Sequence, residues 1–276
     1  MTTRALVLGG GGVTGVAWET GLLLGLERQG IRLQAADLLV GTSAGSVVAA
    51  QISGTTSLDD LYRAQLDGFA QELPSKLGLL SILSLVVALR GTKDERQALA
   101  KVGARALRTT TVSEESRRAV IAQRLPVHTW PARALKIPAI DAITGEFTVF
   151  DSSSGVDLVD AVAASCAVPM VWPPVTIASR RYIDGGMRSV ANVDLAAGFE
   201  RVLVIAPVTT ALRRGGEPAA QLAALHTLGS ALVAPDREAR AAMGSNSLDP
   251  RYRAASAAAG LAQASRVADT VAAAWG

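Results

Sequence analysis

The chain contains 276 residues, of which 49% are hydrophobic, 4% aromatic and 18% charged, and its mean hydropathy is +0.30. This length suits one large α/β domain, so we expect a single domain spanning residues 1–276. The apolar composition favours contact with lipid. The formal net charge is only +3 and the basic residues are scattered in pairs, which argues against a nucleic-acid partner.

Cysteine usage and the apolar segments indicate the compartment. Cys166 is the only cysteine, so an intrachain disulfide is impossible and no Cys/His cluster can hold a metal. The longest nearly uncharged apolar stretch, Leu77–Leu89, is shorter than the roughly 20 residues that cross a bilayer, and the N-terminal apolar run is too short for a signal peptide. We expect a cytoplasmic protein without a transmembrane helix, in peripheral contact with a membrane at most.

The first part of the chain alternates strands and helices. Arg4–Leu8 is a short apolar run that ends in glycines, and Val13–Gln29 then has apolar residues at helical spacing. A second strand is predicted over Asp37–Val40, a tight turn over Gly41–Gly45 and a helix over Ala44–Ile52. This β-α-β-α order predicts parallel strands with helices on both faces, hence a three-layer α/β/α sandwich with a mostly parallel central sheet.

The middle of the chain, 58–123, has helical periodicity almost throughout, and we interpret it as a helical insertion that could form a lid. Strand patterns return after Pro126, and the remainder from Glu217 onward is Ala-rich and predicted helical. The elements expected in between are a hairpin of Ala134–Ile143 and Glu146–Phe150 about Thr144-Gly145, a helix over Asp157–Ser165, a strand ending at Asp184, and a strand over Val202–Ala206.

The apolar segment Leu77–Leu89 is consistent with two interpretations. It is apolar on nearly every face and flanked by Lys76 and Arg90, and its length is typical of a buried core helix. The alternative is a lid or interfacial helix that opens an acyl pocket at a lipid surface.

A glycine loop follows the first predicted strand. Gly10-x-Gly12-x-x-Gly15 matches the dinucleotide fingerprint, but the second strand does not end in the acidic residue that binds a ribose. Gly15 is followed by Val16 and Ala17, where a phosphate loop requires lysine and a hydroxyl residue. Backbone N–H groups at the start of a helix can instead stabilise the oxyanion of an ester intermediate. A simple tight turn is the structural alternative.

Gly41-Thr42-Ser43-Ala44-Gly45 has the G-x-S-x-G pattern of a nucleophile elbow, between an apolar strand and a small-residue helix. Glycines on both sides let strand and helix pack closely while the serine hydroxyl stays exposed. The alternative is that Ser43 only caps the helix that begins at Ala44. The flanking strand favours the nucleophile.

A Ser-His-Asp triad would need a histidine after the acid in chain order. The chain has only His128, just before a strand, and His226, within a predicted Ala/Leu-rich helix, and neither is a strong candidate. A second acidic motif is Asp184-Gly185-Gly186, where two glycines after a strand-end aspartate allow a backbone path that side chains would block. A triad esterase using either histidine remains an alternative.

Four motifs follow one another along the chain: Gly10-Gly11-Gly12-Val13-Thr14-Gly15, Gly41-Thr42-Ser43-Ala44-Gly45, Ala164-Ser165-Cys166-Ala167-Val168-Pro169 with Pro173-Pro174, and Asp184-Gly185-Gly186. In order and spacing, they resemble the motifs of the patatin-like phospholipases over about Arg4–Pro207. Four ordered motifs are far more specific than any one of them.

The resemblance implies a serine-aspartate dyad without cofactor or metal. Ser43 would attack an acyl ester of a phospholipid or glyceride, a buried Asp184 would take the serine proton, and the backbone of Gly10, Gly11 and Gly12 would form the oxyanion hole. Thr14 stands where many relatives carry a basic residue, so neutral esters are open as substrates too. A rival is a lipid-binding or regulatory protein that keeps this fold without effective catalysis.

Overall fold

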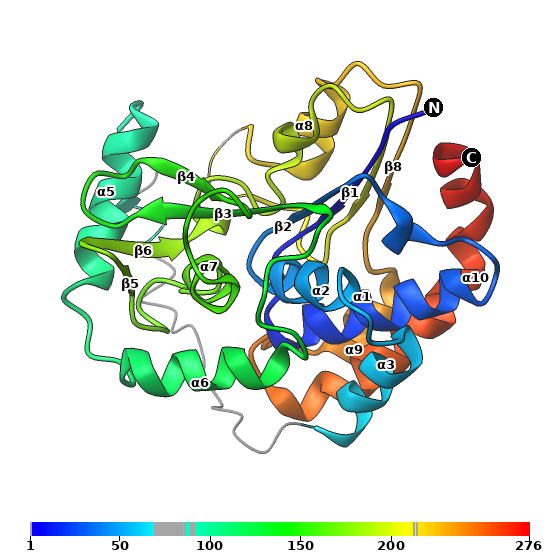
Figure 1. Ribbon diagram of the computed structural model, residues 1–276, viewed down its shortest axis with the longest axis horizontal. Coiled ribbons are helices and arrows are strands. Elements are labelled where there is room, and N and C mark those ends of the chain that lie inside the picture. The colour runs from blue at the N-terminus through cyan, green and yellow to red at the C-terminus, as the bar shows by residue number, and fades with distance from the viewer. Residues whose placement is uncertain (1, 69–84, 86, 89–91, 212, 214) are drawn as a thin grey trace.

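The computed structural model describes residues 2–68, 85, 87, 88, 92–211, 213 and 215–276 (Figure 1). The strands are β1 Arg4–Leu8, β2 Leu38–Gly41, β3 Ala134–Asp141, β4 Phe147–Phe150, β5 Val175–Ile177, β6 Arg180–Asp184, β7 Arg201–Ile205 and β8 Gly229–Val233. The α-helices are α1 Gly12–Glu27, α2 Ala44–Ile52, α3 Leu58–Asp67, α5 Glu95–Ala106, α6 Glu114–Arg124, α7 Leu158–Ser165, α8 Pro218–Ala223, α9 Arg237–Met243 and α10 Arg253–Trp275. Short 3-10 helices include η2 Gly185–Met187, η3 Val193–Ala196 and η4 Pro250–Tyr252.

The described strands form one mixed sheet in the order β5-β6-β3-β2-β1-β7-β8, with β4 pairing to β3 beside this path. The strands β3, β2, β1, β7 and β8 run parallel, and β4, β5 and β6 are paired antiparallel. The predicted parallel start and the hairpin about Thr144-Gly145 are both confirmed. Because the parallel strands point the same way, β1 and β2 bring the turns that follow them to one edge of the sheet.

Alternate residues of the central strands feed two separate cores. Leu6 and Leu8 of β1 lie in one apolar cluster with residues of α1, α2, α7 and α10. Ala5 and Val7 face the other side, in a cluster that includes residues of η3 and Leu222 of α8. Successive strand residues point to opposite faces, so a strand that is buried on both faces has a nearly continuous apolar sequence. The predicted three-layer α/β/α class is confirmed.

Helices α1 and α10 pack together unusually closely in this structure (Figure 1). A Cβ added at Gly21 would lie 2.0 Å from the Ala257 carbonyl oxygen, and one added at Gly260 would lie 2.2 Å from the Trp18 carbonyl oxygen. Glycine at both positions therefore lets the two backbones approach. The contact anchors the C-terminal helix to the helix that follows the glycine loop.

The C-terminal part differs from the sequence-based expectation. The region after Glu217 was predicted to be helical, yet it contains β8, which pairs in parallel with β7 at the sheet edge. Small residues in Gly229–Val233 carry no strong strand signal, and pairing with a neighbouring strand overrides local propensity. His226 lies in the loop before β8 and not in a helix, so that prediction is wrong.

The predicted insertion 58–123 contains α3, α5 and α6, as expected from its periodicity. Most of the apolar segment Leu77–Leu89 falls outside the described residues. Of the segment, Leu85 and Ala88 are buried beside residues of α5, whereas Val87 is 56% exposed. Within the described part of the chain, no helix has the length and apolar character needed to cross a membrane.

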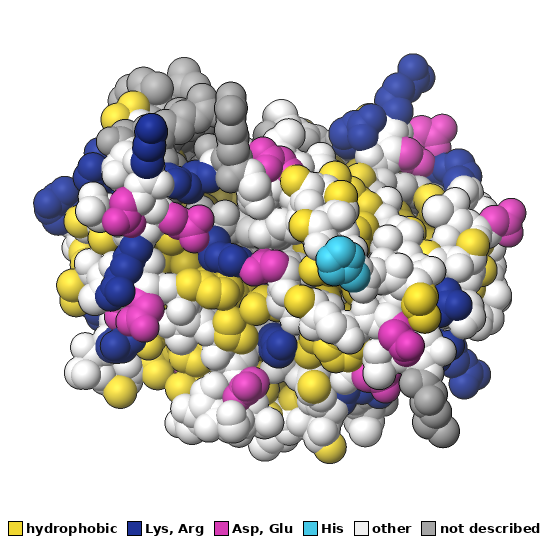
Figure 2. Space-filling view, turned by 90° about the horizontal axis from the view of Figure 1, so that it is seen from above, with side chains coloured by type: hydrophobic (Ala, Val, Ile, Leu, Met, Phe, Trp, Pro, Cys, Tyr) yellow, Lys and Arg dark blue, Asp and Glu magenta, His cyan; other side chains and the backbone are white. Residues whose placement is uncertain are grey.

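The charged side chains are dispersed over the face seen in Figure 2. Lys and Arg side chains there alternate with Asp and Glu and with hydrophobic side chains, and they do not merge into one continuous basic surface. This distribution agrees with the scattered basic pairs in the sequence.

Replacing Gly260 by Val should destabilise the protein by about 1–3 kcal/mol, because the added atoms meet the α1 backbone. Chemical unfolding measures this loss. Ala258→Val on the exposed side of α10 is the matched control and should cost under about 1 kcal/mol. Equal stability losses at the two positions would contradict the close helix contact.

Candidate active site

The turn between β2 and α2 holds Ser43 in a backbone conformation that L-residues rarely adopt, with φ 53° and ψ −118°. The two glycines of the turn occupy positions without space for a side chain: a Cβ at Gly45 would lie 2.1 Å from the Leu8 carbonyl oxygen, and one at Gly41 would lie 2.6 Å from the Gly45 carbonyl oxygen. Ser43 occupies the N-cap position of α2, but its side chain makes no capping hydrogen bond. A purely capping role for Ser43 is therefore not supported.

The backbone of Ser43 is fixed from the end of α7. Its N–H donates to Ser165 Oγ at 3.0 Å, and its carbonyl oxygen accepts from Cys166 Sγ at 3.2 Å and from Ser46 Oγ at 2.6 Å. These contacts leave the Ser43 hydroxyl as the part of the residue that faces a cavity. The turn is thus held in its strained conformation by a distant segment of the chain.

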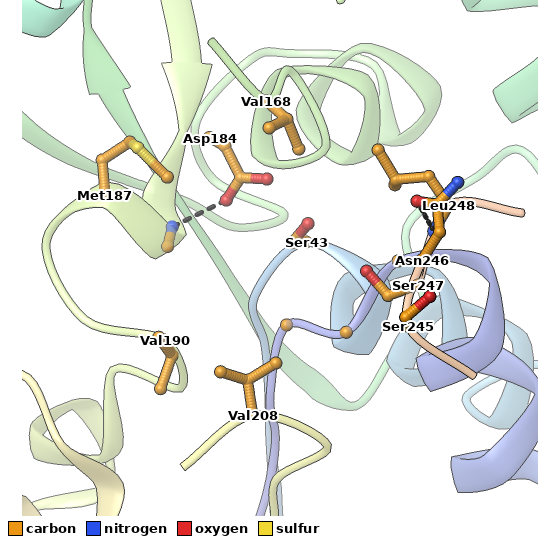
Figure 3. A pocket seen from close by; sticks show the side chains of 14 residues that line it. Ser43, Val168, Asp184, Met187, Val190, Val208, Ser245, Asn246, Ser247 and Leu248 are labelled. Carbon is orange, nitrogen blue, oxygen red and sulfur yellow. Dashed lines mark hydrogen bonds between the residues drawn. The ribbon is translucent and has the colours of Figure 1, made fainter. Parts of the chain in front are cut away.

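Asp184 ends β6 and faces the same cavity as Ser43 (Figure 3). It is buried, with 2% of its surface exposed. Its Oδ1 accepts from the Gly186 N–H at 2.7 Å, and its own N–H donates to the Ala167 carbonyl oxygen at 3.0 Å. The structure therefore brings together the two side chains that the sequence predicted as a dyad.

Burial controls the electrostatics of the carboxyl group. Desolvation raises the pKa of Asp184 to about 6, and the opposing effects are smaller: interaction with the Ser43 hydroxyl, the hydrogen bond from Gly186 and the charge of Arg117. A carboxyl with this pKa is ionised at neutral pH but holds a proton more readily than an exposed aspartate. Asp184 can therefore both accept a proton and release it near pH 7.

Asn192 joins the two loops and was not predicted from the sequence. It is fully buried and left-handed, with φ 50°. Its Nδ2 donates to Thr42 Oγ1 at 3.1 Å and lies 3.4 Å from the Gly185 carbonyl oxygen, next to Ser43 and Asp184 respectively. One amide group thus connects the turn that carries the serine to the loop that follows the aspartate.

The glycine loop lies against the same cavity, but its three glycines differ. The Gly10 N–H donates to the Val190 carbonyl oxygen at 2.7 Å, so this amide is already occupied. Gly11 and Gly12 lie at the start of α1, where first-turn N–H groups have no partner within the helix. Gly12 has φ 63°, and a Cβ there would lie 2.6 Å from the Ser247 carbonyl oxygen. Of the three glycines predicted to form the oxyanion hole, Gly11 and Gly12 are therefore the ones whose N–H groups could bind an oxyanion.

The cavity has a volume of about 340 Å³. Apolar side chains dominate one part of its wall, and the loop between α9 and η4 supplies another part (Figure 3). No local pattern predicts this loop as part of the site, because only the tertiary fold brings it there. The lining residues other than glycines are Ser43, Val168, Asp184, Met187, Val190, Val208, Ser245, Asn246, Ser247 and Leu248.

Thr14 and the histidines lie away from the cavity. Thr14 is fully buried, and its N–H donates to the Ser247 carbonyl oxygen at 3.1 Å. His128 is exposed, with Nε2 2.9 Å from the Ala122 carbonyl oxygen, and His226 is exposed in its loop. Neither histidine is among the residues that line the cavity at Ser43. The geometry gives no support to a triad.

The fold and the site define an α/β protein with a serine-bearing turn after a buried parallel strand. The family model described as patatin-like phospholipase matches residues 6–197. The chain belongs to the patatin-like phospholipase family, and at the level of that family it is a hydrolase of lipid esters. No curated protein matches the chain in sequence.

Solved structures that are similar to the chain have low sequence identity to it. The structure of VipD from Legionella pneumophila is similar with a TM-score of 0.50 and 13% identity, over 98% of this chain and 67% of VipD. The type III effector ExoU gives a TM-score of 0.43 at 17% identity, over 98% of this chain and 53% of ExoU. ExoU from Pseudomonas aeruginosa in complex with SpcU gives a TM-score of 0.42 at 15% identity, over 99% of this chain and 52% of ExoU. The chain thus spans about half the length of ExoU.

Replacing Asp184 by Asn should make the protein more stable at alkaline pH. Burial raises the folded-state pKa of Asp184 to about 6. Ionisation of this carboxyl therefore lowers the stability of the fold as the pH rises from the ordinary pKa of an aspartate through about 6. The stability advantage of Asp184→Asn should grow by about 2 kcal/mol between about pH 4 and pH 8. Urea unfolding at both pH values measures it, and a pH-independent difference would contradict the buried, desolvated carboxylate.

Proposed function

We propose that this protein hydrolyses lipid acyl esters through an acyl-Ser43 intermediate, with Asp184 as the only proton-transferring partner. The observation that carries the proposal is the shared cavity, into which a serine on a strained turn and a desolvated carboxyl both project. The family match to residues 6–197 supports the reaction class.

In the proposed mechanism, Asp184 accepts the Ser43 proton while Oγ attacks the ester carbonyl carbon. The N–H groups of Gly11 and Gly12 stabilise the resulting oxyanion, and loss of one such donor costs about 3 kcal/mol in other enzymes. The tetrahedral intermediate collapses when Asp184 protonates the departing alcohol, which leaves the acyl group on Ser43. Water then attacks the acyl carbon with Asp184 as the base, and Asp184 returns the proton to Ser43 Oγ as the fatty acid is released.

The raised pKa makes a carboxylate more suitable for this role. An aspartate near its reference pKa of roughly 4 is a weak base at neutral pH. Burial brings the pKa of Asp184 to about 6, closer to the pH at which it would work. The hydrogen bond from the Gly186 N–H holds Asp184 Oδ1 in place. The interaction of the carboxylate with Ser43 orients the serine hydroxyl.

The cavity supports a lipid ester as substrate. Its apolar wall, including Val168, Met187, Val190 and Val208, suits an acyl chain. Its volume of about 340 Å³ is at the small end of ligand pockets. Phospholipids and neutral glycerides both fit the proposal. Peripheral contact with a membrane, and a lid formed by Leu77–Leu89, remain predictions from the sequence.

Ser43→Ala and Asp184→Asn should each lower kcat/KM for a lipid ester by about a thousandfold or more, since each removes a group that acts in the transition state. A fluorophosphonate probe should label the wild-type protein at Ser43 and should not label Ser43→Ala. Folded variants that retain turnover would reject the dyad. A wild-type protein that is neither labelled nor active would favour the non-catalytic lipid-binding alternative.

The rate should depend on pH through Asp184. Because the base must be ionised, kcat/KM for a neutral ester should fall about tenfold per pH unit below a pKa of about 6. His128→Ala and His226→Ala are the controls, and both should retain the wild-type profile because the two side chains are exposed away from the cavity. An acidic limb that disappears with either histidine would favour a triad esterase instead.

A further inference from the structure

The cavity at Ser43 has two chemically different walls. Met187 and Val190 lie to one side of Ser43 in Figure 3, whereas the loop 245–248, here called the polar loop, lies to the other side. The polar side chains with which this loop lines the cavity are Ser245, Asn246 and Ser247. An ester carries its acyl part and its alcohol part on different sides of the reacting carbonyl carbon, so each wall can receive one of the two parts.

The polar loop is fixed beside the glycines proposed to bind the oxyanion. The Ser247 carbonyl oxygen accepts from the Thr14 N–H at 3.1 Å, and a Cβ added at Gly12 would lie 2.6 Å from the same oxygen. Within the loop, Asn246 Oδ1 accepts from the Leu248 N–H at 3.3 Å. The Ser247 side chain points from this backbone toward the cavity (Figure 3). A serine hydroxyl in this place can both donate a hydrogen bond to a substrate hydroxyl and accept one from it.

The charge of the cavity favours an uncharged substrate. Among the described residues that line it, Asp184 is the one ionisable side chain. Burial raises the pKa of Asp184 to about 6, so this carboxyl is ionised at neutral pH. A phosphate beside it would lose hydration and meet a like charge, and both effects disfavour binding. The buried Arg117 and Arg124 line a neighbouring side cavity of about 30 Å³, which has room for a water molecule or two and not for a phosphate group.

We propose that the polar loop is the subsite for the leaving alcohol, and that it selects acyl esters of uncharged alcohols that carry further hydroxyl groups, the chemistry of monoacylglycerols and diacylglycerols. The Ser247 hydroxyl binds a free hydroxyl of that alcohol while the acyl chain lies along the apolar wall. The inference rests on the proposed function, because it names the substrate class of the same site.

The test compares three water-soluble esters of butanoic acid: the glycerol monoester, the propyl ester and the glycerol 3-phosphate monoester. The wild-type protein should have its highest kcat/KM for the glycerol ester and its lowest for the phosphate ester. Ser247→Ala should lower kcat/KM for the glycerol ester about threefold to tenfold more than for the propyl ester, because one hydrogen bond to the alcohol is lost. Ser265→Ala makes the same chemical change at an exposed position of α10 and should keep the wild-type ratio.

Ser247→Lys provides a second, independent test, because it places a positive charge on the polar loop. Ser247 is exposed, so the fold should tolerate both substitutions. In Ser247→Lys the ratio of kcat/KM for the phosphate ester to that for the glycerol ester should rise about tenfold or more.

An unchanged ratio in either Ser247 variant would overturn the inference, and so would a wild-type preference for the phosphate ester. Equal losses on all three esters would give the loop a structural role alone and would overturn it too. A wild-type protein that hydrolyses none of the three esters and is not labelled at Ser43 would contradict the proposed function instead, so the two failures are distinguishable.

Discussion

The backbone that leads from β2 into α2 passes so close to β1 that no side chain fits at Gly45. An added Cβ at Gly45 would come within 2.1 Å of the Leu8 carbonyl oxygen. The strand and the helix can approach in this way only if the residue between them takes a φ of 53°, which costs conformational energy for any residue but glycine. The position of the hydroxyl, and with it the proposed chemistry, depends on this crowding.

The second constraint is a buried carboxylate placed opposite the turn. Desolvation of Asp184 works against folding, and the contacts around it hold it in place nonetheless: the Gly186 amide, the Ala167 carbonyl and the Asn192 amide that connects the two loops. Asp184 and Ser43 come from segments far apart in the chain, and they approach because β3 pairs with both β2 and β6. A strained serine and a desolvated carboxylate are held in place because the two apolar cores fix the surrounding elements.

Much of this arrangement could be predicted from the sequence because its signals are local. Arg4–Leu8 and Ala44–Ile52 were predicted with the observed bounds, and the pairs of glycines marked the positions of Ser43 and Asp184. What escaped prediction depends on contacts between distant segments. The strand β8 forms by pairing with β7, the loop Ser245–Leu248 reaches the cavity only in the folded chain, and Asn192 has no local pattern that reveals its bridging amide. The hydrogen bond from the Gly10 N–H to the Val190 carbonyl oxygen likewise joins distant segments, so the sequence alone could not predict it.

The most direct test of the central claim is to trap the covalent intermediate. The protein is mixed with a slowly deacylating ester and quenched in acid within the first turnovers, and peptide mass spectrometry locates the acyl group. The account predicts a mass increase of one acyl group on the peptide that contains Ser43, at that residue. Ester turnover with no acyl group on Ser43, or with the acyl group on another side chain, would contradict it.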